Sequence, residues 1–323
     1  MTSRHTDPPA AMRAVVQDRF GGPEVLRLVE RPVPEPGPSQ VLVRVHAAGL
    51  NPTDWKHRSG RRFLGDPPYV LGWDVSGVVE RVGIGVTLLE PGDEVFGMLP
   101  YPYGAGSFAD YVTAPTRALA RKPAGLGHVE AAGVPLAALT AWQALVDTAG
   151  LAEGQRVLVH AAAGGVGHLA VQIAAARGAR VVGTASAKKH EFVLGLGAEE
   201  VIDYRAVDFA AELDGLDVVL DTVGGDYGMR SLDTLRPGGT LVTTLPVGQE
   251  EVIAQARERG MRAAAMLVEH DHAGMSAVAD LVSRGLLKAH VSEVFPLDRI
   301  ADAHRAGETG HTTGKIVVDV AGA

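Results

Sequence analysis

The sequence contains no cysteine among its 323 residues. No disulfide can form, so the composition gives no argument for an oxidising compartment. The same absence excludes zinc sites built from thiolates and excludes thiol nucleophiles. Long uninterrupted apolar runs are also missing, and the first residues lack the apolar stretch of a secretory signal. We therefore expect a cytoplasmic protein with no membrane association.

Positive charge is scarce as well. Lys and Arg number 30 against 38 Asp and Glu, which gives a formal net charge of −8. An acidic surface repels phosphate backbones, and the few aromatic residues form no visible patch with basic ones. These features argue against nucleic acid as a partner.

The hydrophobic pattern changes near residue 130. Before it, short runs such as 41–50 and 74–83 alternate apolar and polar residues between Gly and Pro, which favours a compact antiparallel barrel or sandwich. Residues 128–150 have helical spacing. From Gln155 onward, strand-like runs alternate with helical ones. This alternation predicts right-handed βαβ units and a parallel sheet, and hence an α/β protein.

A glycine-rich turn, HAAAGGVGHLA at 160–170, stands between a predicted strand and a predicted helix. It contains Ala162-x-Gly164-x-x-Gly167, the dinucleotide fingerprint with Ala in the first glycine position. Gly164 would let the backbone approach a pyrophosphate, and Gly167 would let the helix pack closely on the strand. Packing of small residues at an ordinary turn is the alternative. Because strand, turn, helix and second strand are all in place, we interpret it as a cofactor site.

The second strand of this region indicates which dinucleotide is bound. An NAD site usually has an acid about 20 residues beyond the glycines, to hold the ribose 2′-hydroxyl. Here 183–189 reads GTASAKK, and the next acid is Glu191. The hydroxyl of Ser186 and the ammonium groups of Lys188 and Lys189 suit a 2′-phosphate, although surface lysines at a helix start are common. We therefore favour NADPH.

An ordered set of motifs resembles the zinc-independent medium-chain dehydrogenases/reductases, the quinone oxidoreductase-like group. The similarity covers residues 12–320 and includes AAGLNPTDWKHRSG, LGWDVSGVVERVG, HAAAGGVGHLAVQIA and GKIVV. It implies an α/β fold with a GroES-like β-rich catalytic domain, a Rossmann doubly wound parallel-sheet domain that binds NADPH, and a homodimer. The expected boundaries are a flexible tail over 1–11, the catalytic domain over 12–136 and 286–323, and the Rossmann domain over 137–285.

The zinc ligands of related enzymes are replaced in this sequence. In zinc-dependent relatives a Cys stands at the position of Asn51 and a His at the position of Trp73. No Lewis acid is then available to polarise a carbonyl group. His270 and His272 flank an aspartate and resemble a metal pair, but no third ligand lies nearby in the sequence. We interpret them as surface histidines and expect no metal.

The resemblance implies hydride transfer to a conjugated acceptor: a quinone, an enone or an enoyl thioester. Negative charge then develops on the acceptor oxygen, where donors lower the barrier. Asn51, Asp54 and Lys56 of the active-site loop are the candidate catalytic residues. Asn51 would donate an amide hydrogen bond, and Lys56 would stabilise charge or relay a proton. Asp54 would orient the loop or Lys56, beside which it lies if the loop is extended. A surface role is the alternative for Lys56.

The enoyl-thioester reductases of the group carry an acidic tyrosine just after this loop. Here residues 61–63 read RRF, so a tyrosine proton donor is not evident and solvent can supply the proton. Tyr69, Tyr101 and Tyr103 lie further along the chain. We expect them to line the substrate site, with ordinary aromatic packing as the alternative.

The turn, the second strand and the resemblance together give a set of expected cofactor contacts. They are Thr140, Ala163, Gly164, Gly165, Val166, Gly167, Ser186, Lys188, Lys189, Tyr204, Thr222, Val223, Leu245, Pro246 and Lys315. Two other functions stay open at this point. One is an enoyl reductase of polyketide or acyl thioesters, and the other is a non-catalytic NADPH-binding or RNA-binding protein.

Overall fold

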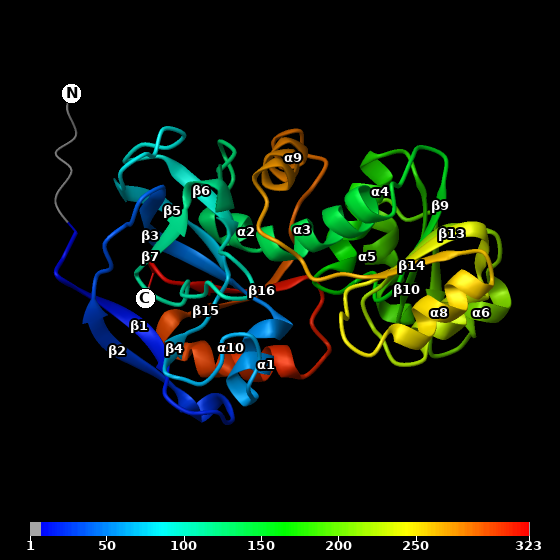
Figure 1. Ribbon diagram of the computed structural model, residues 1–323, viewed down its shortest axis with the longest axis horizontal. Coiled ribbons are helices and arrows are strands. Elements are labelled where there is room, and N and C mark those ends of the chain that lie inside the picture. Colours follow the sequence, from blue (N-terminus) through cyan, green and yellow to red (C-terminus); the bar gives the residue numbers. More distant parts are fainter. Residues whose placement is uncertain (1–7, 323) are drawn as a thin grey trace. The chain divides into compact units, whose positions relative to one another are not determined.

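The computed structural model describes residues 8–322, which form two compact units (Figure 1). The first unit contains the chain up to residue 136, residues 269–283 and the chain from residue 289. The second unit contains 137–268 and 284–288. Residues 1–7 of the expected tail lie outside the described part, and the first strand begins at Ala11.

The first unit is β-rich, as its alternating pattern predicts. One sheet has the order β15-β16-β3-β5-β6-β8 with β7 also on β3, and a smaller sheet has the order β2-β1-β4. All pairs are antiparallel except β15 with β16. The strands are β1 (Ala11–Gln17), β2 (Leu26–Pro32), β3 (Gln40–Leu50), β4 (Tyr69–Val70), β5 (Asp74–Val82), β6 (Glu94–Met98), β7 (Tyr111–Pro115), β8 (Leu119–Arg121), β15 (Val291–Pro296) and β16 (Lys315–Asp319).

Helices complete the first unit. Helix α10 packs against β15 and β16, which brings the end of the chain back to the N-terminal strands (Figure 1). Helix α9 packs against β8, so it groups with the first unit, although its residues fall inside the 137–285 segment that we expected in the Rossmann domain. The helices are α1 (Pro52–Ser59), α2 (His128–Ala132), α9 (His272–Ser283) and α10 (Ile300–Glu308).

The second unit is a six-stranded parallel sheet with the order β11-β10-β9-β12-β13-β14. Buried residues such as Leu158, Val182 and Leu241 form its core. The direction of the strand order reverses between β9 and β12, which makes this a doubly wound sheet with a switch point there and confirms the expected Rossmann fold. The strands are β9 (Arg156–Val159), β10 (Arg180–Ala185), β11 (Glu200–Asp203), β12 (Leu216–Asp221), β13 (Leu235–Thr243) and β14 (Arg262–Ala265).

The helical region predicted over 128–150 is divided in the structure. Helix α2 ends at Ala132 and α3 (Pro135–Trp142) begins anew at a proline, because proline cannot donate the hydrogen bond that would continue the first helix. The other helices of the second unit are α4 (Gly167–Ala176), α5 (His190–Gly195), α6 (Phe209–Glu212), α7 (Tyr227–Leu232) and α8 (Glu250–Glu258). Across the described residues, every helix is too short or too polar to cross a membrane.

Candidate functional site

The glycine-rich turn connects β9 to the N-terminus of α4. A Cβ atom added to Gly167 would lie 2.2 Å from the carbonyl oxygen of Ala161 and 2.8 Å from Cα of Ala162. Both neighbours are backbone atoms and cannot move aside. Gly167 is therefore required for close packing of the helix on the strand, as the fingerprint predicts.

Three consecutive backbone N–H groups at this turn have no acceptor. No described residue accepts a hydrogen bond from the N–H of Gly165, Val166 or Gly167, whereas His168 donates to the carbonyl oxygen of Gly164. These N–H groups lie at the N-terminus of α4, which carries partial positive charge. Unpaired donors beside a helix N-terminus form an anion site, so the turn fits the pyrophosphate of a dinucleotide.

Most of the other expected cofactor residues follow the carboxyl ends of neighbouring parallel strands. Ligands of doubly wound sheets bind along this edge, at the switch point. Thr140 differs, because it is buried in α3. The residues on the edge are Ser186 after β10, Tyr204 after β11, Thr222 and Val223 after β12, and Leu245 and Pro246 shortly after β13.

The segment after β10 concentrates positive charge. Lys188 is exposed and Lys189 is half-buried. Burial lowers the pKa of Lys189, and the charges of Lys188 and Arg205 lower it further. Arg205, which the sequence did not single out, lies with its guanidinium 5.6 Å from the centre of the Tyr204 ring. The buried Ser186 has no hydrogen-bond partner for its hydroxyl among residues 8–322. An anion placed here would relieve the repulsion and use the hydroxyl.

The loop that contains the candidate catalytic residues folds into helix α1. Pro52 occupies the first helical position, where its missing N–H costs nothing. The Asp54 carboxylate accepts the backbone N–H of Asn51 (2.7 Å), one half of a capping box, and also the N–H of Gly72 (3.0 Å). Asp54 thereby ties the start of α1 to the chain that leads into β5. The loop-orienting role that we expected for it stays a prediction.

The helix changes the expected relation between Asp54 and Lys56. Their expected proximity was conditional on an extended loop, whereas residues two apart on a helix point roughly 200° apart. Asp54 is fully buried, whereas Lys56 is exposed and its amine has no hydrogen bond or ion pair with any residue in 8–322. The extended case therefore does not apply. The Asn-Pro-x-Asp spacing, a helix start signal, would have shown this in the sequence.

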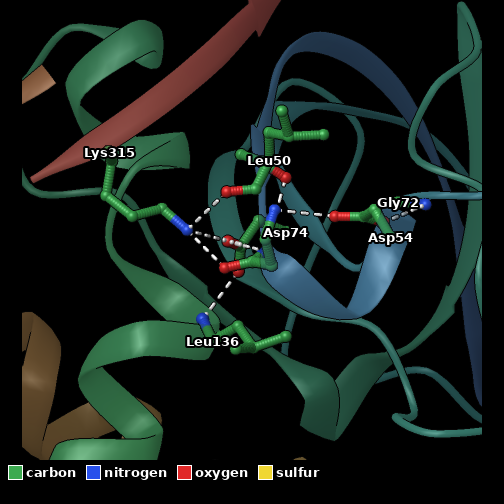
Figure 2. A network of polar contacts seen from close by, with 8 residues as sticks. Leu50, Asp54, Gly72, Asp74, Leu136 and Lys315 are labelled. Atoms are coloured by element: carbon green, nitrogen blue, oxygen red, sulfur yellow. Dashed lines mark hydrogen bonds and ion pairs between the residues drawn. The ribbon is translucent and has the colours of Figure 1, made fainter. Parts of the chain in front are cut away.

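A buried polar network connects Lys315, Asp74 and Leu50 (Figure 2), and Asn51 belongs to it. Asp74, at the start of β5, accepts the N–H of Leu136 (2.6 Å), the side-chain amide of Asn51 (2.8 Å) and the ammonium of Lys315 (3.4 Å). Lys315 also donates to the carbonyl oxygen of Leu50 (3.0 Å) and to the side-chain oxygen of Asn51. The amide of Asn51 and the amine of Lys315 are thus both engaged inside the first unit. The structure gives Lys315 buried oxygen partners where the sequence suggested a cofactor contact.

Two acidic groups share one ammonium in this network. Burial is the main cause that raises the pKa of Asp54 to about 8; the N–H groups of Asn51 and Gly72 and the charge of Lys315 act against it, and Asp74 adds to it. Burial likewise raises the pKa of Asp74, against the opposing charge of Lys315. Lys315 is therefore the residue that stabilises negative charge in this part of the core.

The three predicted substrate tyrosines differ in their surroundings. The Tyr69 hydroxyl donates to the carbonyl oxygen of His57 (2.9 Å), and burial raises the pKa of Tyr69 to about 12. Tyr101 is half-buried, and its ring centre lies 5.3 Å from that of Trp73. Tyr103 is 74% exposed and meets the exposed ring of Phe63 edge to face at 6.5 Å. Tyr101 and Tyr103 thus belong to an aromatic surface beside α1.

Two features bear on metal binding. One is the position of Trp73, and the other is the pair His270 and His272, which flank an aspartate. Trp73 is fully buried and its indole N–H has no hydrogen-bond partner among residues 8–322. His272 begins α9, two residues after His270. Within residues 8–322, no three His, Asp or Glu side chains gather closely enough to hold a metal ion.

The comparisons with known proteins agree with this architecture. An alcohol dehydrogenase GroES-like domain model matches residues 37–124, and a zinc-binding dehydrogenase model matches residues 196–318. The chain is 36% identical to the chloroplastic NADPH-dependent alkenal/one oxidoreductase of Arabidopsis thaliana, over 96% of this chain and 80% of the relative.

Two solved structures extend this likeness. The quinone oxidoreductase of Coxiella burnetii is 39% identical with a TM-score of 0.90, over 96% of this chain and 99% of that one. The Escherichia coli quinone oxidoreductase complexed with NADPH is 28% identical with a TM-score of 0.85, over 95% of this chain and 100% of that one.

Proposed function

This chain belongs to the quinone oxidoreductase-like group of the medium-chain dehydrogenases/reductases, and from this membership we propose its reaction. The chain is an oxidoreductase that uses a nicotinamide cofactor on small molecules. We propose that it transfers hydride from NADPH to a quinone or an α,β-unsaturated carbonyl compound, without a metal. The names of the relatives, alkenal/one oxidoreductase and quinone oxidoreductase, support this acceptor class.

The observation that carries the proposal is the phosphate cradle. Gly165, Val166 and Gly167 offer three N–H groups that no residue in 8–322 pairs, at the start of α4 and beside the switch point of the parallel sheet. Such a cradle holds a pyrophosphate, and the cofactor then supplies the hydride. Residues after β12 and β13, including Thr222 and Leu245, would bind the nicotinamide half.

The preference for the 2′-phosphate is also a proposal. Lys188 and Lys189 would neutralise the phosphate charge, and the Ser186 hydroxyl would donate to one of its oxygens. Arg205 adds a further positive charge that acts on Lys189. No acid stands in the 183–189 segment to hold a free ribose 2′-hydroxyl. NADPH is therefore the better partner than NADH.

Lys56 is the residue that we propose to stabilise charge on the acceptor oxygen. Its ammonium is exposed and has no ionic partner among residues 8–322, so it is available to an anionic oxygen. Asn51 and Asp54 would hold α1 in place rather than touch the acceptor. A Lys56→Ala variant should lose about tenfold or more in kcat/KM, corresponding to about 1.5–3 kcal/mol for a charge-assisted hydrogen bond. An unchanged rate would remove Lys56 from the mechanism.

The proposed function is tested by measuring NADPH consumption against a quinone, a short enone and an enoyl thioester, each repeated with NADH. We expect turnover of the quinone or the enone, with NADPH strongly preferred. Preferred turnover of the thioester would instead indicate an enoyl reductase. Tight NADPH binding without turnover of any acceptor would indicate a binding protein and would refute the proposal.

Two further expectations, a homodimer and a cytoplasmic location, stay predictions. Sedimentation of the purified chain tests the first, since a monomeric mass at working concentrations would contradict it. Imaging or fractionation of the tagged chain in its own cells tests the second.

A further inference from the structure

A chain of hydrogen bonds runs from α1 to the aromatic surface. His57 Nδ1 lies 2.8 Å from the carbonyl oxygen of Thr53 and 3.1 Å from the Thr53 hydroxyl. The Thr53 hydroxyl in turn lies 3.3 Å from the hydroxyl of Tyr101. His57 is only 2% exposed, whereas Thr53 and Tyr101 are half-buried, so the chain runs from the core toward the surface.

The carbonyl partner fixes the direction of the first of these hydrogen bonds. A carbonyl oxygen can only accept, so His57 Nδ1 carries the hydrogen and donates to Thr53. Burial lowers the pKa of His57, so the ring is neutral and its Nε2, which has no partner among residues 8–322, carries no hydrogen. The Thr53 hydroxyl can accept from His57, and it donates to the Tyr101 hydroxyl. The hydrogen of the Tyr101 hydroxyl is therefore left without an acceptor among residues 8–322.

The surroundings of Tyr101 keep this hydroxyl protonated and fix its ring. Burial raises the pKa of Tyr101, the Asp54 carboxyl raises it further, and the donated bond from Thr53 and the charge of Arg62 act in the opposite direction. Those two groups would stabilise the phenolate that remains once the proton has left. The ring meets Trp73 and Phe63 edge to face, with centres 5.3 and 6.5 Å apart. Phe63 is 44% exposed and offers a flat apolar face to a planar conjugated acceptor.

We propose that Tyr101 is the general acid that protonates the α-carbon of an α,β-unsaturated carbonyl acceptor. This rests on the proposed function above. Hydride addition at the β-carbon moves an electron pair onto the carbonyl oxygen and gives an enolate. The α-carbon then forms its C–H bond as the Tyr101 O–H bond breaks, and that electron pair stays on the phenolate oxygen. Thr53 donates to this oxygen until water returns a proton. The acceptor gains one hydride and one proton, and the cofactor is oxidised.

This assignment separates two acceptor classes. A quinone is protonated on oxygen, which exchanges protons rapidly with water and needs no positioned acid. An enone is protonated on carbon, where a positioned acid contributes about 10²–10⁴-fold. Loss of the Tyr101 hydroxyl should therefore slow enone reduction and leave quinone reduction nearly unchanged. A structural defect in the site would slow both.

The test compares Tyr101→Phe with the wild type and with Tyr111→Phe, the same chemical change on β7. Enone and quinone reduction are measured with NADPH, and enone products formed in deuterium oxide are analysed for the face of the α-carbon that carries deuterium. We expect wild type and Tyr111→Phe to label one face. We expect Tyr101→Phe to lose about 10²-fold or more in enone kcat, to keep quinone kcat within about twofold, and to label both faces.

Any one of three results would overturn the proposal. The first is a Tyr101→Phe variant that keeps the wild-type rate of enone reduction and places deuterium on one face of the α-carbon. The wild type could reduce quinones alone, which would leave the proposed function standing without this step. A wild type that reduces neither acceptor would refute both.

Thr53→Val and Thr53→Ser give a second test that leaves the tyrosine ring intact. Valine removes the bond donated to Tyr101, so the fall of enone kcat at high pH should shift to higher pH. Serine keeps the hydroxyl and should restore the wild-type profile. An identical profile for all three proteins would contradict the assignment.

Discussion

Removal of the Lys315 side-chain charge should strongly destabilise the first unit. The ammonium is 3% exposed and donates to the carbonyl oxygen of Leu50, to Asn51 and to Asp74. Lys315→Met leaves Asp74 as a buried charge without its cation, and removing one partner of a buried ion pair costs about 3–5 kcal/mol. At about 2–4 °C per kcal/mol for a unit of this size, the first unfolding transition should drop by roughly 6–20 °C.

Scanning calorimetry of the purified protein measures this change. Lys56→Met is the matched control, because its exposed amine has no partner in the described residues and the variant should stay within about 0.5 kcal/mol of the wild type. Adding Asp74→Asn to Lys315→Met should recover part of the loss, since the buried charge is gone. The reasoning is refuted if Lys315→Met unfolds like the wild type and instead binds NADPH more weakly, which would make Lys315 a cofactor contact.

Gly167→Ala places a Cβ atom 2.2 Å from a backbone oxygen, so it should lower the free energy of unfolding by about 1–3 kcal/mol and weaken NADPH binding in a fluorescence titration. The control Gly195→Ala, with open space around its Cβ position, should change neither. Lys189→Glu should raise the KM for NADPH by about 10–100-fold and lower the KM for NADH, because the new carboxylate repels the 2′-phosphate and accepts a hydrogen bond from the 2′-hydroxyl. Equal effects on both cofactors would contradict the 2′-phosphate site. The free energy of unfolding, measured with urea, should fall as pH drops below 6.5, because two buried histidines and one half-buried histidine have pKa values that burial lowers, so they refuse protons that the unfolded chain binds. They are His128 (pKa about 4), His160 (about 3) and His304 (about 3).

Local patterns in the sequence predicted the second unit well. Strand, turn and helix around Gly167 are adjacent in the chain, and their roles follow from backbone geometry that a glycine pattern encodes. The parallel order of β9, β10 and β12 follows from alternating strands and helices. The short strand β14 carries a weak signal, RAAA, and was not anticipated.

The polar network of the first unit could not be predicted in this way. Lys315 and Asp74 are 241 positions apart, and no periodicity links them. The hydrogen bonds from His57 through Thr53 to Tyr101 depend on the helical form of 52–59, which we did not predict. Whether a side chain on this short helix is exposed or buried depends on its position around the helix axis. A different local structure would therefore change which of these side chains are buried.

We have proposed that this chain delivers hydride from NADPH to a carbon of a conjugated acceptor. The decisive experiment uses NADPH that carries deuterium at the transferable position of the nicotinamide. After reduction of a short enone, mass and NMR analysis of the product locates the label. We expect one deuterium on the β-carbon. An unlabelled product, or oxidised cofactor with unchanged enone, would contradict the proposed hydride transfer.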